Sequence, residues 1–98
     1  MNREQVIARL KAHERELRAA GIAQLSLFGS VARGEAGPDS DVDVAVKLDP
    51  TRGIDLFELG GLNIRLEHLL GTPIDLVTEP VRRLRFQERI DRDRILVF

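Results

Sequence analysis

The chain is expected to form a small α/β domain in which helices flank a mixed β-sheet of three strands, with a candidate fourth strand at the C-terminus. Segments with helical apolar spacing alternate with short runs that have the alternating or continuous apolar character of strands. The 98 residues are enough for one modest core, so we expect a single domain over residues 1–98. Apolar residues make up 43% and charged residues 32%, a balance that argues against disorder.

The first third of the chain predicts a helix, a strand and a tight turn. Asn2 is placed to cap a helix that Gly21 ends. Residues 22–28 are an apolar run that indicates a buried strand, and residues 31–33 resemble one helical turn stopped by Gly34. The apolar face of the first helix consists of Val6, Leu10, His13 and Leu17.

Residues 41–48 alternate between large apolar and other side chains, which is typical of a strand with one buried face. The connection from Phe28 to Asp41 is short for a parallel crossover. We therefore expect these two strands to be antiparallel or offset within a mixed sheet. Helices should cover one face of the sheet more than the other, because the face that carries Asp41 and Asp43 has to stay open to a ligand.

A second long helix is expected from Asp55 to Leu70, with Gly71 closing it. The pair Gly60-Gly61 in its middle costs about 1 kcal/mol per glycine relative to alanine. The helix therefore either kinks or starts late there, or another backbone approaches it closely. The apolar stripe of this helix consists of Leu59, Leu62, Leu66 and Leu69.

The C-terminal part of the chain predicts the remaining elements and contains an arginine-rich stretch. Residues 72–77 predict a short strand, and Pro80 opens a last helix at its first turn. Residues 79–94 hold six arginines and four acidic residues, which favours a solvated helix face over a contact with phosphates or an acidic partner. Residues 95–98 are too apolar to hang free, so they either add an edge strand or dock on a partner.

Composition narrows the possible function classes. The net charge of −1 and the absence of Trp and Tyr argue against direct nucleic-acid binding. The absence of Cys excludes disulfides, thiolate chemistry and cysteine-ligated zinc. No apolar run reaches the ~20 residues of a membrane span, and the N-terminus lacks the apolar region of a secretory signal. We therefore expect a cytoplasmic protein with no membrane contact.

Two closely spaced carboxylates point to metal-dependent phosphorus chemistry. Asp41 and Asp43 lie two apart on a strand, so their side chains point the same way with α-carbons roughly 6.5 Å apart. Carboxylates so placed can converge on divalent ions ~3.5–4 Å from each other, as in two-metal sites. Upstream, Gly29 and Ser30 offer backbone N–H groups and a hydroxyl to phosphate oxygens. Residues 27–46 therefore offer a phosphate cradle and a metal platform.

Asp75 is the third candidate ligand. It lies in an otherwise apolar strand, where a lone carboxylate is costly unless it is paired or metal-bound. If this strand lies beside residues 41–48, Asp75 shares the face of Asp41 and Asp43 and shares their cations. The alternatives are a pair with an arginine such as Arg82, or plain exposure near a strand edge.

This motif resembles the polymerase-β-type nucleotidyltransferases, and within them most of all the stand-alone minimal nucleotidyltransferases. The resemblance rests on LFGSVARGEA at residues 27–36, SDVDVAV at residues 40–46 and IDLV at residues 74–77. Neither a Gly-Ser pair nor an Asp-x-Asp pair is specific alone, but both at this spacing, with a later strand aspartate, rarely arise by chance. The resemblance covers nearly the whole chain and implies a polymerase-β-type nucleotidyltransferase core.

The resemblance also implies roles for individual residues. Gly29 and Ser30 would hold the triphosphate of a nucleotide, usually ATP. Asp41 and Asp43 would bind two Mg²⁺ ions. Asp75 matches the third carboxylate, which in such enzymes binds metal and helps to deprotonate the attacking hydroxyl.

Arg33 occupies the position of the arginine in the motif, and two roles stay open for it. It could contact the phosphates or a partner as part of the nucleotide site. A salt bridge with Glu35 or Asp39 is the other role that the sequence allows.

Proteins of this kind are similar to antitoxins that are paired with a HEPN-type toxin, commonly encoded by the adjacent gene. The implied activity is transfer of AMP from ATP to a hydroxyl, in particular that of a tyrosine, on the toxin, which neutralises it. The chain has no Tyr, so the acceptor has to come from outside. Two alternatives stay open, an antitoxin that acts by binding alone with weak or no catalysis, and a nucleotidyltransferase for small molecules.

Overall fold

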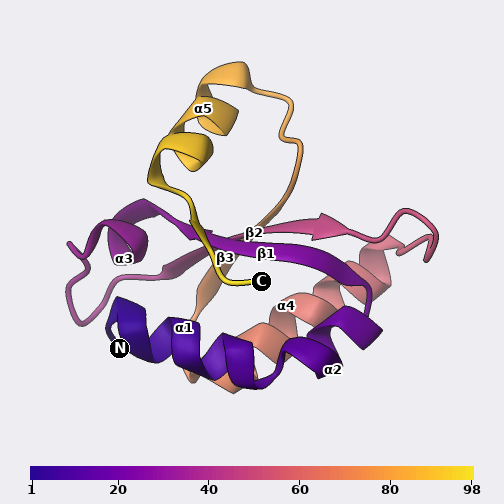
Figure 1. The fold of residues 1–98 in the computed structure, drawn as a ribbon, viewed down its shortest axis with the longest axis horizontal. Helices are drawn as coiled ribbons and strands as arrows, with labels where there is room; N and C mark the ends of the chain where they lie inside the picture. Colours follow the sequence, from indigo (N-terminus) through magenta and orange to yellow (C-terminus); the bar gives the residue numbers. More distant parts are fainter.

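The computed structural model describes all residues 1–98 and contains five helices and four strands (Figure 1). In chain order they are α1 (Arg3–Ala12), α2 (Glu14–Ala19), β1 (Ile22–Phe28), α3 (Gly29–Arg33), β2 (Val42–Leu48), α4 (Leu56–Leu70), β3 (Ile74–Thr78), α5 (Leu84–Asp93) and β4 (Ile95–Leu96). None of the helices has the length and apolar character needed to cross a lipid bilayer. The expected α/β class is confirmed.

The four strands form one mixed sheet in the order β3-β2-β1-β4. β1 and β2 are antiparallel, as the short connection predicts, whereas β2 and β3 are parallel. β4 pairs antiparallel with β1, and the amide of Leu25 donates to the carbonyl of Phe98 at 2.9 Å. Of the two roles left open for the apolar tail, the edge strand is therefore the one observed.

The two faces of the sheet are covered unequally. α1, α2 and α4 lie under one face, α5 stands on the opposite face, and α3 lies at one end (Figure 1). Val42, Val44 and Val46 point into the main core, whereas Ala45 joins Ile90 of α5 in a smaller cluster on the other face. The predicted alternation in β2 is confirmed, and it places the aspartate face on the less covered side.

The first helical segment is interrupted, which the sequence pattern does not predict. The expected continuous helix is two helices, because His13 leaves the helical conformation with φ −110° and ψ 16°. The predicted cap is confirmed, since the Asn2 side chain accepts from the amide of Gln5 while the Gln5 side chain accepts from the amide of Asn2. Leu10 and Leu17, on either side of the break, are both fully buried.

α4 runs unbroken through its two glycines. Asp55 caps it by accepting from the amide of Glu58 at 2.8 Å, so the helix begins well before Gly60. A Cβ atom placed on Gly60 or Gly61 would meet nothing within 4 Å. A late start and a close backbone approach are therefore both wrong, and the fold of this chain gives no reason for either glycine.

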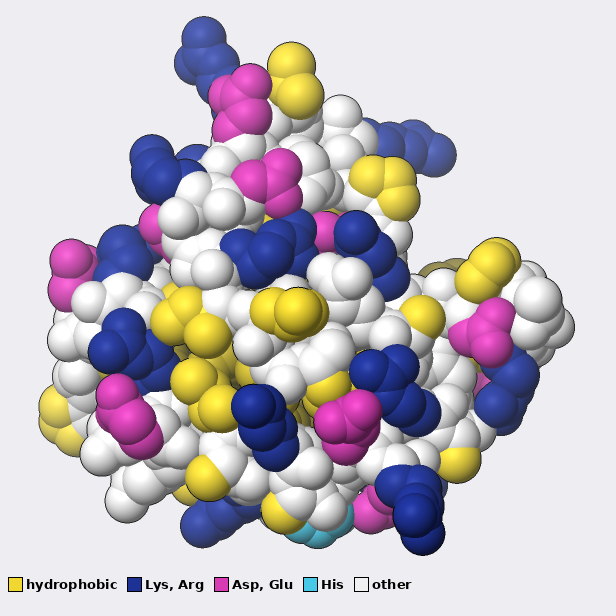
Figure 2. Space-filling model, in the orientation of Figure 1, with side chains coloured by type: hydrophobic (Ala, Val, Ile, Leu, Met, Phe, Trp, Pro, Cys, Tyr) yellow, Lys and Arg dark blue, Asp and Glu magenta, His cyan; other side chains and the backbone are white.

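Arg94, at the end of α5, ties this helix to the sheet. Its guanidinium donates to Ser26 at 2.9 Å, to Glu79 at 2.7 Å and to Asp91 at 2.7 Å. Ser26 is completely buried, and the Glu79 side chain is 2% exposed. The expectation that the arginines of residues 79–94 form a solvated helix face therefore does not hold for Arg94. Figure 2 shows exposed basic side chains at the tip and base of the α5 lobe, while Arg94 is a structural ion-pair partner.

We predict that Arg94→Ala lowers the free energy of unfolding by about 2 kcal/mol, because it leaves the Glu79 carboxylate buried without its partner. Urea denaturation measures the loss. Arg65→Ala is the matched control, since Arg65 forms an exposed ion pair with Glu16 whose loss should cost under ~1 kcal/mol. Equal losses in the two variants would contradict the anchoring role of Arg94.

Candidate active site

A pocket of about 610 Å³ opens on the aspartate face of the sheet, under α5. Five of the residues predicted for the site line the pocket, namely Gly29, Ser30, Arg33, Asp43 and Asp75. Asp41 does not line it. The lining is completed by Phe28, Leu76, Val77, Phe86, Arg89 and Asp93.

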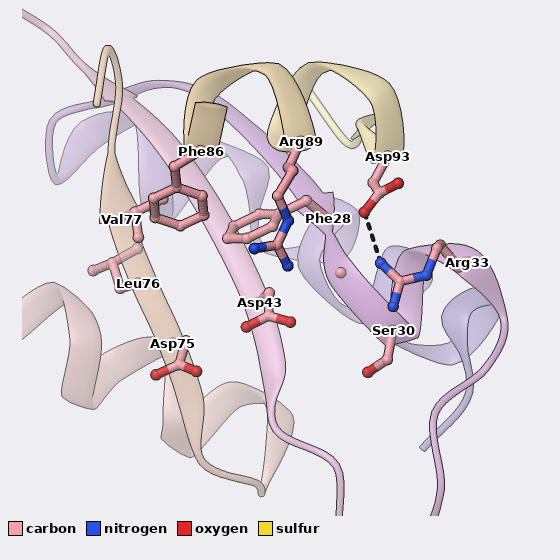
Figure 3. Close-up of a pocket in the computed structure, with 11 residues that line it drawn as sticks. Phe28, Ser30, Arg33, Asp43, Asp75, Leu76, Val77, Phe86, Arg89 and Asp93 are labelled. Carbon is pink, nitrogen blue, oxygen red and sulfur yellow. Dashed lines mark hydrogen bonds and ion pairs between the residues drawn. The ribbon is translucent and has the colours of Figure 1, made fainter. Parts of the chain in front are cut away.

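The register of β2 against β3 brings two carboxylates together. Asp43 lies directly opposite Asp75 in the parallel ladder. The neighbours Val42 and Ile74 point into the main core, so both aspartates point to the other face. Figure 3 shows their side chains next to each other at the floor of the pocket. The expectation that Asp75 shares the face of Asp43 agrees with this geometry.

The environment of Asp43 disfavours the ionised form of its carboxyl group. Burial, followed by the negative charges of Asp75 and Asp41, raises the pKa of Asp43 from 3.8 to about 6. Arg33 opposes this shift more weakly. A divalent cation between the carboxylates would remove the repulsion, and carboxylate oxygens are the ligands that Mg²⁺ prefers.

Asp41 lies one residue before β2 and is exposed, so it flanks the pair instead of closing over it. Its charge still acts on Asp43. No three Asp, Glu or His side chains in the chain are arranged as a metal-binding group. The structure therefore presents a preformed pair, Asp43 and Asp75, with a third carboxylate beside it.

Gly29 allows the Asp43 carboxylate to lie directly against the backbone. Its φ is +72°, a conformation that costs other residues roughly 1–2 kcal/mol. A Cβ atom on Gly29 would also collide with the Asp43 side chain. The chain thus brings its backbone against the Asp43 carboxylate, at the point where β1 ends and α3 begins. Ser30 follows directly and also lines the pocket.

Arg33 is held by two carboxylates. It donates to Glu35 at 2.9 Å and to Asp93 of α5 at 2.7 Å, and the Asp93 side chain is only 6% exposed. The predicted salt bridge with Glu35 is confirmed, whereas Asp39 takes no part in it. Arg33 therefore joins α3 to α5 across the mouth of the pocket (Figure 3).

Sequence reasoning missed the residues that α5 contributes. Phe86 packs edge-on against Phe28, with ring centroids 5.8 Å apart. Arg89 points from α5 into the pocket above Asp43, and no hydrogen bond or ion pair joins it to the other lining residues (Figure 3). The helical spacing of Phe86, Arg89 and Asp93 is the signal that places them on one face of α5.

The arrangement of these residues suits a polyphosphate that is chelated to a divalent cation. The acid pair lies at the centre, Gly29 and Ser30 lie on one side of it, and Arg89 lies above it. Carboxylates, a bare backbone turn and an unpaired guanidinium are the groups that bind metal-chelated phosphates.

Known proteins share this fold and sequence. Residues 9–97 match the model of the nucleotidyltransferase domain family. Protein adenylyltransferase MntA of Thermococcus cleftensis is 41% identical over 75 residues, which cover 76% of this chain and 74% of that protein. The solved structure of a minimal nucleotidyltransferase has a TM-score of 0.81 at 37% identity, covering 97% of this chain and 95% of that chain.

Solved toxin–antitoxin complexes also contain the fold. A complex with AMP-PNP gives a TM-score of 0.72 at 21% identity, with 100% of this chain and 73% of that chain covered. The tri-AMPylated Shewanella oneidensis HEPN toxin in complex with its MNT antitoxin gives 0.69 at 17% identity, with 98% and 71% covered. The likeness to these two concerns the fold. Because the family model spans most of the sequence and the MntA relative agrees with it, the chain belongs to the nucleotidyltransferase domain family.

Proposed function

We propose that this nucleotidyltransferase transfers AMP from ATP to a tyrosine hydroxyl of a HEPN-type toxin and thereby acts as its antitoxin. The observation that carries the proposal is the Asp43–Asp75 pair beside the bare backbone of Gly29. Support for the acceptor comes from the relatives, one of which is a protein adenylyltransferase and one of which binds an AMPylated HEPN toxin. The toxin would be encoded by the adjacent gene.

The acidic residues would hold Mg²⁺. In this proposal Asp43 and Asp75 would bind directly, and Asp41, which lies beside them just before β2, would complete the set. When bound, two Mg²⁺ ions supply charge neutralisation at the phosphates and acidify the attacking hydroxyl. The raised pKa of Asp43, which reflects burial and the neighbouring carboxylates, fits such an occupant.

The chain's own groups then position the reactants. Ser30 and the backbone at Gly29 hold the β- and γ-phosphates, and Arg89 contacts the triphosphate from above. The acceptor oxygen forms a bond to the α-phosphorus while the bond from that phosphorus to the bridging oxygen breaks. Pyrophosphate leaves, and Asp75 receives the hydroxyl proton.

The direct test incubates the chain with α-labelled ATP, Mg²⁺ and its HEPN-type partner. Label on the partner supports the enzyme. Neutralisation of the toxin without any label would instead establish an antitoxin that acts by binding alone.

Asp43→Asn is predicted to lower AMP transfer by about 100-fold or more, the scale expected when an electrostatic element of the transition state is lost. The variant should keep its circular-dichroism spectrum, because the amide has the shape of the carboxyl. Asp39→Asn, in the exposed turn before β2, is the control and should keep full activity. Retained transfer by the Asp43 variant would remove the metal role of this residue.

The raised pKa of Asp43 predicts a pH-dependent stability in EDTA. The pKa in the folded state, about 6, lies above the value of 3.8 for an unperturbed group, so the folded state takes up a proton first as the pH falls. The stability of the wild type relative to Asp43→Asn should therefore rise by about 1 kcal/mol between pH 8 and pH 5, a value discounted for partial exposure. Urea titrations at several pH values measure it. A difference that stays constant with pH would show that Asp43 ionises normally.

Arg89→Ala is predicted to weaken ATP binding about tenfold or more, because one charge-assisted contact to phosphate is lost. A fluorescent ATP analogue measures the affinity directly, and the melting temperature should change little. Arg92→Ala is the matched control, since Arg92 lies on the same helix, is 69% exposed and does not line the pocket. Equal affinities for wild type and the Arg89 variant would rule out the phosphate contact.

A further inference from the structure

A second depression lies beside the active site, on the outer side of β3. It is a groove of about 390 Å³ between the free edge of β3 and the N-terminal half of α4. Two of its residues, Asp75 and Leu76, also line the active-site pocket. The groove and the active-site pocket therefore border on the same stretch of β3, the groove from its outer edge. Its remaining lining consists of Leu56, Leu59, Gly60, Asn63 and Ile74.

The sheet order decides from which side a nucleophile can reach the acid pair. Gly29 and Ser30 follow β1, Asp43 lies on β2 and Asp75 lies on β3, so the three positions follow one another across the sheet (Figure 3). In-line displacement needs the attacking oxygen opposite the leaving pyrophosphate. With pyrophosphate held near Ser30, the attacking oxygen has to come from the β3 side, where the groove lies.

The free edge of β3 offers backbone groups to an incoming chain. The carbonyl of Pro73 accepts from Val42 at 3.3 Å, and the amide of Glu79 donates to Val46 at 2.8 Å, so alternate residues of this segment face β2. By that alternation the backbone of Leu76 and Thr78 faces away from β2. β3 pairs with no strand on that side. An extended segment can add there by backbone hydrogen bonding.

The α4 wall of the groove is apolar and open. Leu56 lines it and is 84% exposed, and its neighbour Phe57 is 92% exposed. Gly60 also lines it, and a Cβ atom there would touch nothing in this chain. Glycine costs a helix about 1 kcal/mol relative to alanine, and the fold of this chain does not require it at this position. A side chain at Gly60 would narrow the groove.

We propose that the hydroxyl-bearing segment of the acceptor protein enters the active site through this groove, extended along the free edge of β3 and passing over Gly60. The inference rests on the proposed function, since it assumes that the acceptor is a protein. The segment carries apolar side chains that pack on Leu56 and Leu59, and its hydroxyl lies at Asp75.

The test compares Gly60→Trp with Gly61→Trp. Both glycines are exposed, both have open space around a Cβ atom, and both lie in the middle of α4, but only Gly60 lines the groove. Gly60→Trp should lower kcat/KM for the HEPN-type partner at least about tenfold while the affinity for a fluorescent ATP analogue stays unchanged. Gly61→Trp should leave both quantities within about twofold. Normal transfer by the Gly60 variant, or an equal loss in both variants, would overturn the proposal.

Cross-linking separates this inference from the proposed function. Because the chain has no Cys, a Gly60→Cys variant can carry one photoreactive maleimide at a known place. It should cross-link to the partner, whereas an Ala19→Cys variant, at an exposed position of α2, should not. Transfer without a cross-link from the Gly60 position would refute the groove alone. A cross-link without any transfer by the wild type would refute the proposed reaction and keep the docking groove.

Discussion

The parallel pairing of β2 with β3 is the constraint on which the site depends. The in-register ladder sets Asp43 beside Asp75, although two like charges at this distance repel. The strands are held in this register by their other faces, because Val42 and Val44 lie in the main core together with Ile74. A slip of one residue would turn a carboxylate into that core. Hydrophobic burial on one side of the sheet therefore maintains the electrostatic strain on the other.

Three arginines around α5, namely Arg33, Arg89 and Arg94, make different contacts. Arg94 is bound by Glu79 and Asp91 and fixes α5 on the sheet, and Arg33 is bound by Asp93 and links α5 to α3. Arg89 alone among these three points into the pocket without such a partner. A guanidinium already paired with carboxylates has little to offer a phosphate, so Arg89 is the one of the three that remains available to a ligand, while the other two hold α5 in place.

The sequence was sufficient where local patterns determine the structure. The alternation in residues 42–48 and the short connection after Phe28 led to the correct sheet faces and the antiparallel pairing. The position of Asp75 followed from one assumption about strand neighbours. The helix break at His13 and the position of α5 over the pocket could not be derived from local patterns, because both depend on tertiary packing. Arg89 differs from its neighbouring arginines only in the surface that α5 turns toward the sheet.

The two edges of the sheet are unequal, and this has a consequence for the handling of the protein. β4 is two residues long and protects the side of β1, whereas no strand pairs with the outer side of the five-residue β3, next to exposed Leu56, and the Glu67 side chain accepts from the amide of Ile74 there. Long open strand margins with apolar neighbours are where chains associate wrongly. The outer edge of β3, which can pair with another polypeptide, is thus also a site at which copies of this chain can associate. Co-expression with a protein that covers this edge would therefore limit aggregation of the chain.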